Sequence, residues 1–413
     1  MWEKPAGSST NSIAVCALEP VGWYFLIMRG FICWLWSLSL LGAITPFRPA
    51  DDTVVLLKLP RGENSAIERE IRSLRATLRN QPDDLVDALR LAQKLLVRAR
   101  AESDPRYLGQ AESVLGPWWS KTEAPTDVLL LRATIEQSRH AFTEALATLD
   151  RILVRDSRAG GAWLTKATIH TLRGDYAEAR RACLPLARLT DSLTAFTAAA
   201  ALGGLTGEAE SSLQHLEEAL ARTKSWDSAT LVWSHNVGAD LAERLDQLEV
   251  AERHYQAALA LVPDDPFTLS VWADFSMLHG HAAEVVTRLT PHAEKDALLL
   301  RLAEAKKMVA KGKTEAVQAE IVRLENGFLI ARRRGVSHAR EEARFYLHLL
   351  NQPTRALVLA QENWQQQREP ADLRLLLECG QAAHNPLAVE SARAWLRTNR
   401  LEDAVFHRLA SAL

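Results

Sequence analysis

The sequence has 413 residues, 47% of them hydrophobic, so it can bury a sizeable core and is not expected to be disordered. Its 49 Lys and Arg against 51 Asp and Glu give a formal net charge of -2, which provides no basic field for phosphates and predicts no nucleic-acid partner. None of the four cysteines forms a CxxC pattern, so we expect no disulfide framework, no metal site and no cofactor.

An uncharged run, Phe31–Ile44, dominates the N-terminal region. It follows Arg29, and its length suits the apolar core of a secretory signal better than a full membrane span. We therefore predict a signal peptide or membrane anchor at residues 28–50. The protein is expected in the bacterial periplasm, or anchored in the inner membrane and facing the periplasm. Residues 1–27 fit no signal architecture and are interpreted as a mis-assigned upstream extension.

Two alternatives stay open for this region. No clear cleavage site follows the apolar run, so Phe31–Ile44 could remain as an uncleaved membrane tether. A run this short also fits a buried core helix, which would make the protein a cytoplasmic regulator.

Residues 51–63 have a β-branched start and end near Pro60, and we interpret them as an extended linker. From residue 64 onward the composition favours Ala, Leu, Arg and Glu, which are good helix formers. We predict that residues 64–413 form a single array of helices.

A period of 34 residues runs through this array. Four residues, Ala133, Phe142, Ala145 and Leu149, correspond at that offset to Ala167, Tyr176, Ala179 and Cys183. The same period relates Ala239 to Ala273. Small residues at fixed positions allow two helices to approach closely, and an aromatic residue fills the space between neighbouring pairs.

These residues resemble the tetratricopeptide repeat family, whose repeat is a helix, a tight turn and a second helix. The clearest units are 126–159, 160–193 and 232–265. Weaker units follow the same register at 193–225, 266–295, 296–330, 337–370 and 371–400. The resemblance implies an all-α, right-handed superhelical solenoid of helix-turn-helix repeats.

Two polar constellations raise the question of catalysis. His170, Asp175 and Cys183 lie close in sequence, but all three occupy positions that the repeat fills with packing or turn residues. A second cluster, His279 and His281, could hold a metal and make this an enzyme or a metal-binding subunit. Because that cluster lies at a repeat turn, where polar residues are common, we favour a protein that is not an enzyme.

The leading interpretation is a scaffold that binds a partner protein or peptide on its concave face. The resemblance implies that positions 2, 5, 9 and 12 of each repeat line that face. The candidates for partner binding are Leu164, Thr168, Thr171, Trp233, Asn236, Asp240, Glu243, Phe267, Ser270, Asp274 and Met277. We expect Trp233, Asn236, Asp240 and Asp274 to lie together on that face, partly solvated, and to contribute little to the core.

Overall fold

The computed structural model describes residues 66–121, 123–222, 226–333 and 338–411. The chain divides into two units, Met1–Glu63 and Asn64–Leu413. The first unit lies outside the described residues, and so do the predictions made for residues 1–27, 28–50 and 51–63. No helix in the described ranges is both long enough and apolar enough to cross a membrane.

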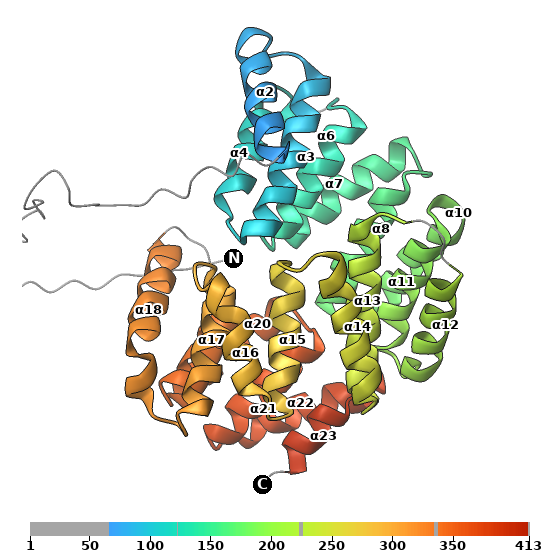
Figure 1. Cartoon of the computed structure of the whole chain (residues 1–413). Coiled ribbons are helices and arrows are strands. Elements are labelled where there is room, and N and C mark those ends of the chain that lie inside the picture. Colours follow the sequence, from blue (N-terminus) through green and yellow to red (C-terminus); the bar gives the residue numbers. More distant parts are fainter. Residues whose placement is uncertain (1–65, 122, 223–225, 334–337, 412–413) are drawn as a thin grey trace, which may run out of the picture. The chain divides into compact units, whose positions relative to one another are not determined.

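All regular elements of the described residues are helices, most of them arranged as successive pairs along the chain (Figure 1). The first half contains α2 (Ala66–Asn80), α3 (Leu85–Glu102), α4 (Arg106–Val114), α5 (Gly116–Trp119), α6 (Thr126–Ser138), α7 (Phe142–Arg155), α8 (Gly160–Arg173), α9 (Tyr176–Cys183), α10 (Leu186–Leu189), α11 (Ser192–Gly203) and α12 (Ala209–Ala221). The prediction of an all-α fold is confirmed for this part of the chain.

The second half continues the pairs and adds three short non-α turns of helix. It contains α13 (Ser228–Arg244), α14 (Leu248–Leu261), α15 (Pro266–Leu278), α16 (Ala282–Leu289), η2 (Thr290–His292), α17 (Asp296–Val309), η3 (Thr314–Val317), α18 (Gln318–Arg333), α19 (Ala339–Arg344), η4 (Phe345–Leu349), α20 (Pro353–Gln366), α21 (Pro370–Ala382), α22 (Pro386–Asn399) and α23 (Ala404–Ser411). The η4 segment is π-helical and continues α19.

Within each of these pairs, the chain reverses direction between the two helices through a residue in the left-handed backbone conformation. From the α6–α7 pair to the α21–α22 pair, these residues are His140, Gly174, Gly207, Asp246, Gly280, Gly312, Asn351 and His384. A left-handed residue ends the first helix and satisfies its last carbonyl groups. Glycine adopts this conformation without cost, and Asn, Asp and His are the next most common residues there. Residue types that favour this conformation therefore occupy these turns, although Lys311, next to Gly312, adopts it as well.

In three of the helix pairs, the first helix begins with the same Asp-x-x-Thr cap. The side chains of Asp191, Asp227 and Asp265 accept hydrogen bonds from the backbone N–H three residues later, at 2.8, 3.0 and 2.8 Å. Each cap satisfies a donor that has no partner within the helix and is worth about 1 kcal/mol. Helices α11, α13 and α15 therefore start at positions fixed by local sequence.

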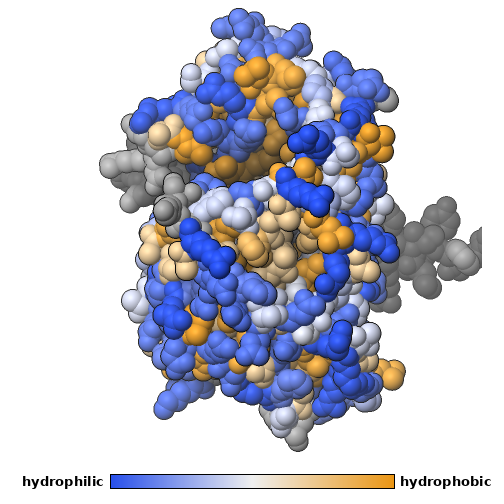
Figure 2. Space-filling model, turned by 90° about the vertical axis from the view of Figure 1, so that its right-hand side faces the viewer, coloured by the Kyte–Doolittle hydropathy of each residue, from blue (hydrophilic) through white to orange (hydrophobic). Residues whose placement is uncertain are grey.

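The residues that carry the 34-residue period form the packing contacts. Ala133, Ala145, Ala179, Ala239 and Ala273 have no exposed surface. The aromatic positions are buried as well, with Tyr176 at 9% and Tyr255 at 2% exposure. On the face shown in Figure 2, hydrophilic side chains predominate and apolar ones gather mainly along a crease.

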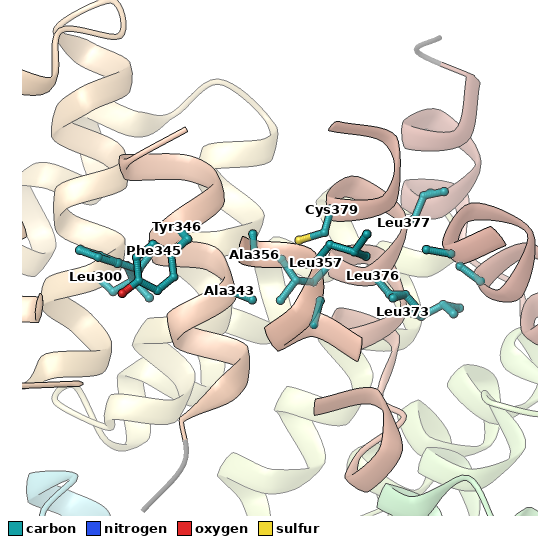
Figure 3. Close-up of a cluster of buried hydrophobic side chains, with 14 of the residues drawn as sticks. Leu300, Ala343, Phe345, Tyr346, Ala356, Leu357, Leu373, Leu376, Leu377 and Cys379 are labelled. Atoms are coloured by element: carbon teal, nitrogen blue, oxygen red, sulfur yellow. The ribbon is translucent and has the colours of Figure 1, made fainter. Parts of the chain in front are cut away.

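The last helices pack against helices that lie much earlier in the chain. Helix α23 contacts α13, and residues of α21 and α22 share one hydrophobic cluster with Tyr176 and Leu202. Side chains from α17, η4, α20 and α21 meet in another part of this cluster (Figure 3). The backbone N–H of Arg368 donates to the carbonyl of Leu172 at 2.7 Å. The end of the array therefore covers part of its own earlier helices.

Candidate functional site

The predicted binding side chains of α8 remain partly accessible. Leu164, Thr168 and Thr171 are half-buried. The hydroxyl of Thr168 donates to the carbonyl of Leu164, and that of Thr171 to the carbonyl of Ala167, each at 2.9 Å. The two hydroxyls are therefore satisfied within their own helix.

On α13, two of the predicted side chains are buried. Trp233 is half-buried, whereas Asn236 and Glu243 are only 7% and 6% exposed. Asn236 donates to Oγ1 of Thr268 on α15 at 2.8 Å, while Asp240 accepts from the guanidinium of Arg244 at 3.0 Å. The expectation that Asn236 is solvated and contributes little to the core is wrong, because its side chain joins α13 to α15.

On α15, one predicted side chain stands out by its exposure. Phe267 is 63% exposed, whereas Ser270 and Met277 are each 8% exposed. The hydroxyl of Ser270 donates to the carbonyl of Pro266 at 2.7 Å. Phe267 is therefore the large apolar side chain of the predicted set that is most available to a partner.

Asp274 on α15 is held by two arginines from other helices. Its carboxylate accepts from Arg301 of α17 at 2.9 Å and from both terminal nitrogens of Arg344 of α19 at 2.8 Å each. Burial raises the pKa of Asp274, but the charges of Arg301 and Arg344 outweigh burial and hold the pKa below its usual value. This side chain therefore links α15, α17 and α19, and the expectation that Asp274 contributes little to the core is wrong.

The network continues from Arg344 to the C-terminal helices. Arg344 pairs with Glu304 of α17 at 2.5 Å, and His348 of η4 lies 3.0 Å from Glu304 and 3.2 Å from Glu378 of α21. Burial lowers the pKa of His348, but the two carboxylates outweigh it and raise the pKa to about 9. His348 is therefore an imidazolium at neutral pH and bridges α17 to α21.

A second network joins α13 to the end of the chain. Arg374 of α21 lies 2.9 Å from Asp403 and 3.5 Å from Glu243. Arg244, whose side chain is 1% exposed, donates to the carbonyl of Gly204 at 2.6 Å and to that of Glu402 at 3.4 Å. Burial raises the pKa of Glu243 to about 7 despite the charge of Arg374. The inner positions of α13 therefore bind the C-terminal helices of the same chain.

The candidate nucleophilic residues lie in packing environments. Burial raises the pKa of Cys183 to about 11 and that of Cys379 to about 12, so both are thiols at neutral pH. His170 is 9% exposed, and its Nδ1 lies 3.6 Å from Asp175. Burial is also the main cause that lowers the pKa of His170. The interpretation of these residues as packing and turn positions is confirmed.

The histidine cluster at the α15–α16 turn is split between two separate contacts. His279 packs on the ring of Phe275, with centroids 4.7 Å apart, whereas His281 places Nδ1 3.1 Å from Glu284. Within the described ranges, no group of three or more His, Cys, Asp or Glu side chains is placed to hold a metal ion. The structure gives His279 and His281 different partners.

Two hollows lie on the described surface. The smaller, about 150 Å³, is lined by polar side chains that include His140, His338 and Gln367. Arg340, which also lines it, is already paired with Asp372 at 2.5 Å. A more open depression of about 470 Å³ lies between His279, Leu278 and Val405. The described lining of neither hollow includes a serine or cysteine nucleophile.

Sequence reasoning missed the partners of the inner acidic residues. Glu304 and His348 stand at positions 9 and 12 of the weaker units 296–330 and 337–370, so extending the register would have found them. Arg301 and Arg344 fall outside the expected positions, and no signal in the sequence pairs them with Asp274.

From His140 to His384 the left-handed turn residues recur at intervals of 32 to 39 residues, and buried alanines lie in the helices on either side of these turns. The described chain has a tetratricopeptide-like fold. No protein-family model matches the sequence, and no curated protein matches it.

Three solved structures illustrate the likeness. The type IV pilus biogenesis factor PilW is 15% identical, with 69% of this chain and 98% of that chain covered and a TM-score of 0.34. A tetratricopeptide repeat protein from Parabacteroides merdae is 15% identical, with 63% and 92% covered and a TM-score of 0.38. Human IFIT1, as a dimer with m7Gppp-AAAA, is 13% identical, with 84% and 86% covered and a TM-score of 0.44. At these scores the likenesses add no argument about function.

Proposed function

We propose that this tetratricopeptide-like protein is an interaction scaffold that binds an extended peptide of a partner protein on its concave face, around Trp233 of α13 and Phe267 of α15. The observation that carries the proposal is the 63% exposure of Phe267, on a helix whose other predicted positions are buried or engaged in ion pairs. Trp233 occupies the equivalent position of the preceding pair and is half-buried. Two aromatic side chains at matching positions form an anchor for an apolar side chain of the partner.

The remaining candidates divide into two roles. Leu164, Thr168 and Thr171 keep part of their surface accessible and extend the proposed contact along α8. The other candidates are buried or bonded within the chain and pack beneath the proposed surface: Asn236, Asp240, Glu243, Ser270, Asp274 and Met277. A net charge of -2 favours a protein partner over a nucleic acid. For location, the apolar run Phe31–Ile44 after Arg29 favours the bacterial envelope.

A site-specific crosslink tests the proposal. A photoreactive benzoylphenylalanine replaces Phe267 in the full chain, and a matched variant carries it at Leu387 on α22, which is 81% exposed. We expect an adduct with a partner protein in the native host from position 267, none from position 387, and a weaker adduct when Trp233→Ala is added. An equal adduct from both positions, or one from position 387 alone, would show that the proposed surface is not the binding site.

A further inference from the structure

Two histidines on one helix pair aim their ring nitrogens at each other. His235 lies on α13 and His254 on α14, and their Nδ1 atoms are 3.0 Å apart, with ring centroids 5.3 Å apart. At this distance one Nδ1 carries a hydrogen and donates it to the other. The pair thus brings two imidazole nitrogens to one point between two helices.

The surroundings hold the His254 ring in this orientation. His254 is 7% exposed, and its ring lies against Gly238. A Cβ added at Gly238 would be 2.7 Å from Cε1 of that ring. Glycine at this position therefore leaves the space that the ring occupies. On the far side, Nε2 of His254 lies 3.7 Å from Glu217 of α12, whose side chain is 45% exposed and also lies 3.9 Å from Arg253. A carboxylate next to the second nitrogen is how proteins orient histidines that bind metals.

We propose that His235 and His254 form a two-imidazole binding site for a divalent transition metal ion such as Zn²⁺. Two nitrogens bound to one tetrahedral zinc at roughly 2.0–2.1 Å lie about 3.3 Å from each other. The observed separation is 3.0 Å, so a small tilt of the half-buried His235 ring opens the pair to that value. The ring that carries hydrogen on Nδ1 takes it on Nε2 instead, which turns both Nδ1 lone pairs to the metal.

The site is open, and its binding is independent of the peptide surface proposed above. In the described part of the chain, no third His, Cys, Asp or Glu completes the pair, so water fills the remaining coordination positions. A bound ion links α13 to α14 and stabilises the folded chain increasingly as its free concentration rises above its dissociation constant. Phe267 takes no part in this site, so loss of metal binding and loss of the peptide crosslink are separate results.

Zinc titration of the full chain tests the site. The protein is purified without a histidine tag, and Zn²⁺ alone is titrated by calorimetry into the wild type, His235→Ala, His254→Ala and the control His281→Ala. His281 is a matched control because it is exposed and lies beside a carboxylate, Glu284, without a second imidazole partner. Melting temperature is recorded with and without Zn²⁺.

We expect one equivalent of Zn²⁺ to bind the wild type and His281→Ala and to raise both melting temperatures. Binding should weaken at least tenfold in His235→Ala and in His254→Ala. If His254→Ala does not fold, His235→Ala decides the matter, because His235 is less buried. The proposal is overturned if the wild type binds no zinc, if His235→Ala binds as tightly as the wild type, or if His281→Ala loses binding.

Discussion

Replacing Asp274 by alanine should destabilise the protein, because this carboxylate lies between two arginines that belong to other helices. Asp274→Ala removes hydrogen bonds of 2.8 Å to each terminal nitrogen of Arg344 and of 2.9 Å to Arg301. Arg344 keeps its contact with Glu304, but Arg301 loses the one carboxylate that the described residues give it. An uncompensated charge then remains in a side chain that is 8% exposed.

The size of the effect follows from burial. Removing one partner of a buried ion pair costs about 3–5 kcal/mol, whereas surface substitutions stay within about 0.5 kcal/mol. The Asp274 side chain is 30% exposed, and Arg301 still donates to the carbonyl of Ser270 at 3.1 Å. Both facts reduce the cost, so we expect Asp274→Ala to lower the free energy of unfolding by about 2–4 kcal/mol.

Urea unfolding followed by circular dichroism measures this loss, and hydrogen exchange locates it. Asp264→Ala is the control, because Asp264 is 77% exposed and lies 3.6 Å from His292 at the surface. Helices α15, α17 and α19 should lose exchange protection in Asp274→Ala only. If Asp274→Ala unfolds at the same urea concentration as Asp264→Ala, the network does not bind these helices together and the reasoning fails.

Three further predictions test other parts of the structure. Because the pKa of His348 in the folded protein is raised to about 9, the stability that His348 contributes is fully present below about pH 6.5 and is lost as pH rises through 9. His348→Gln should therefore flatten the decline in stability between pH 7 and 9. An unchanged slope in pH-dependent urea unfolding would count against the ion pairs with Glu304 and Glu378. Gly174→Ala and Gly280→Ala should each lower the free energy of unfolding by about 1 kcal/mol, since both glycines have positive φ. Gly174→Ala should lower it by about 1–3 kcal/mol more, because its Cβ would lie 2.7 Å from the Trp395 ring, whereas nothing lies within 4 Å at Gly280. Equal melting temperatures of the two variants would argue against the Trp395 contact. A reporter enzyme that works only outside the cytoplasm should be active when fused after residue 60, as the apolar run Phe31–Ile44 predicts; activity of cytoplasmic reporters alone would exclude export.

The local structure of the array could be predicted from the order of its residues. Helix pairs could be predicted because their signals are short-range: alanines and aromatics recur at 34 residues, and a glycine marks the turn at Gly174. The buried Ala179 and Tyr255 show that the same period selects the packing positions. The pattern works because each helix pair packs mainly against its neighbours in sequence.

The partners of the inner side chains depend on contacts between helices that lie far apart in the chain. Asp274 and Arg344 are 70 residues apart, and Arg244 and Glu402 are 158 apart, so no repeat register connects them. Periodicity assigns a side chain to a face of its helix, but it does not show which distant helix lies opposite. Asn236 was therefore predicted on the right helix but in the wrong environment, because its side chain is buried and bonds to Thr268 of α15. Gly174 illustrates both cases: the sequence predicts that the chain turns at this glycine, but it does not predict that the absence of a side chain there leaves space for Trp395.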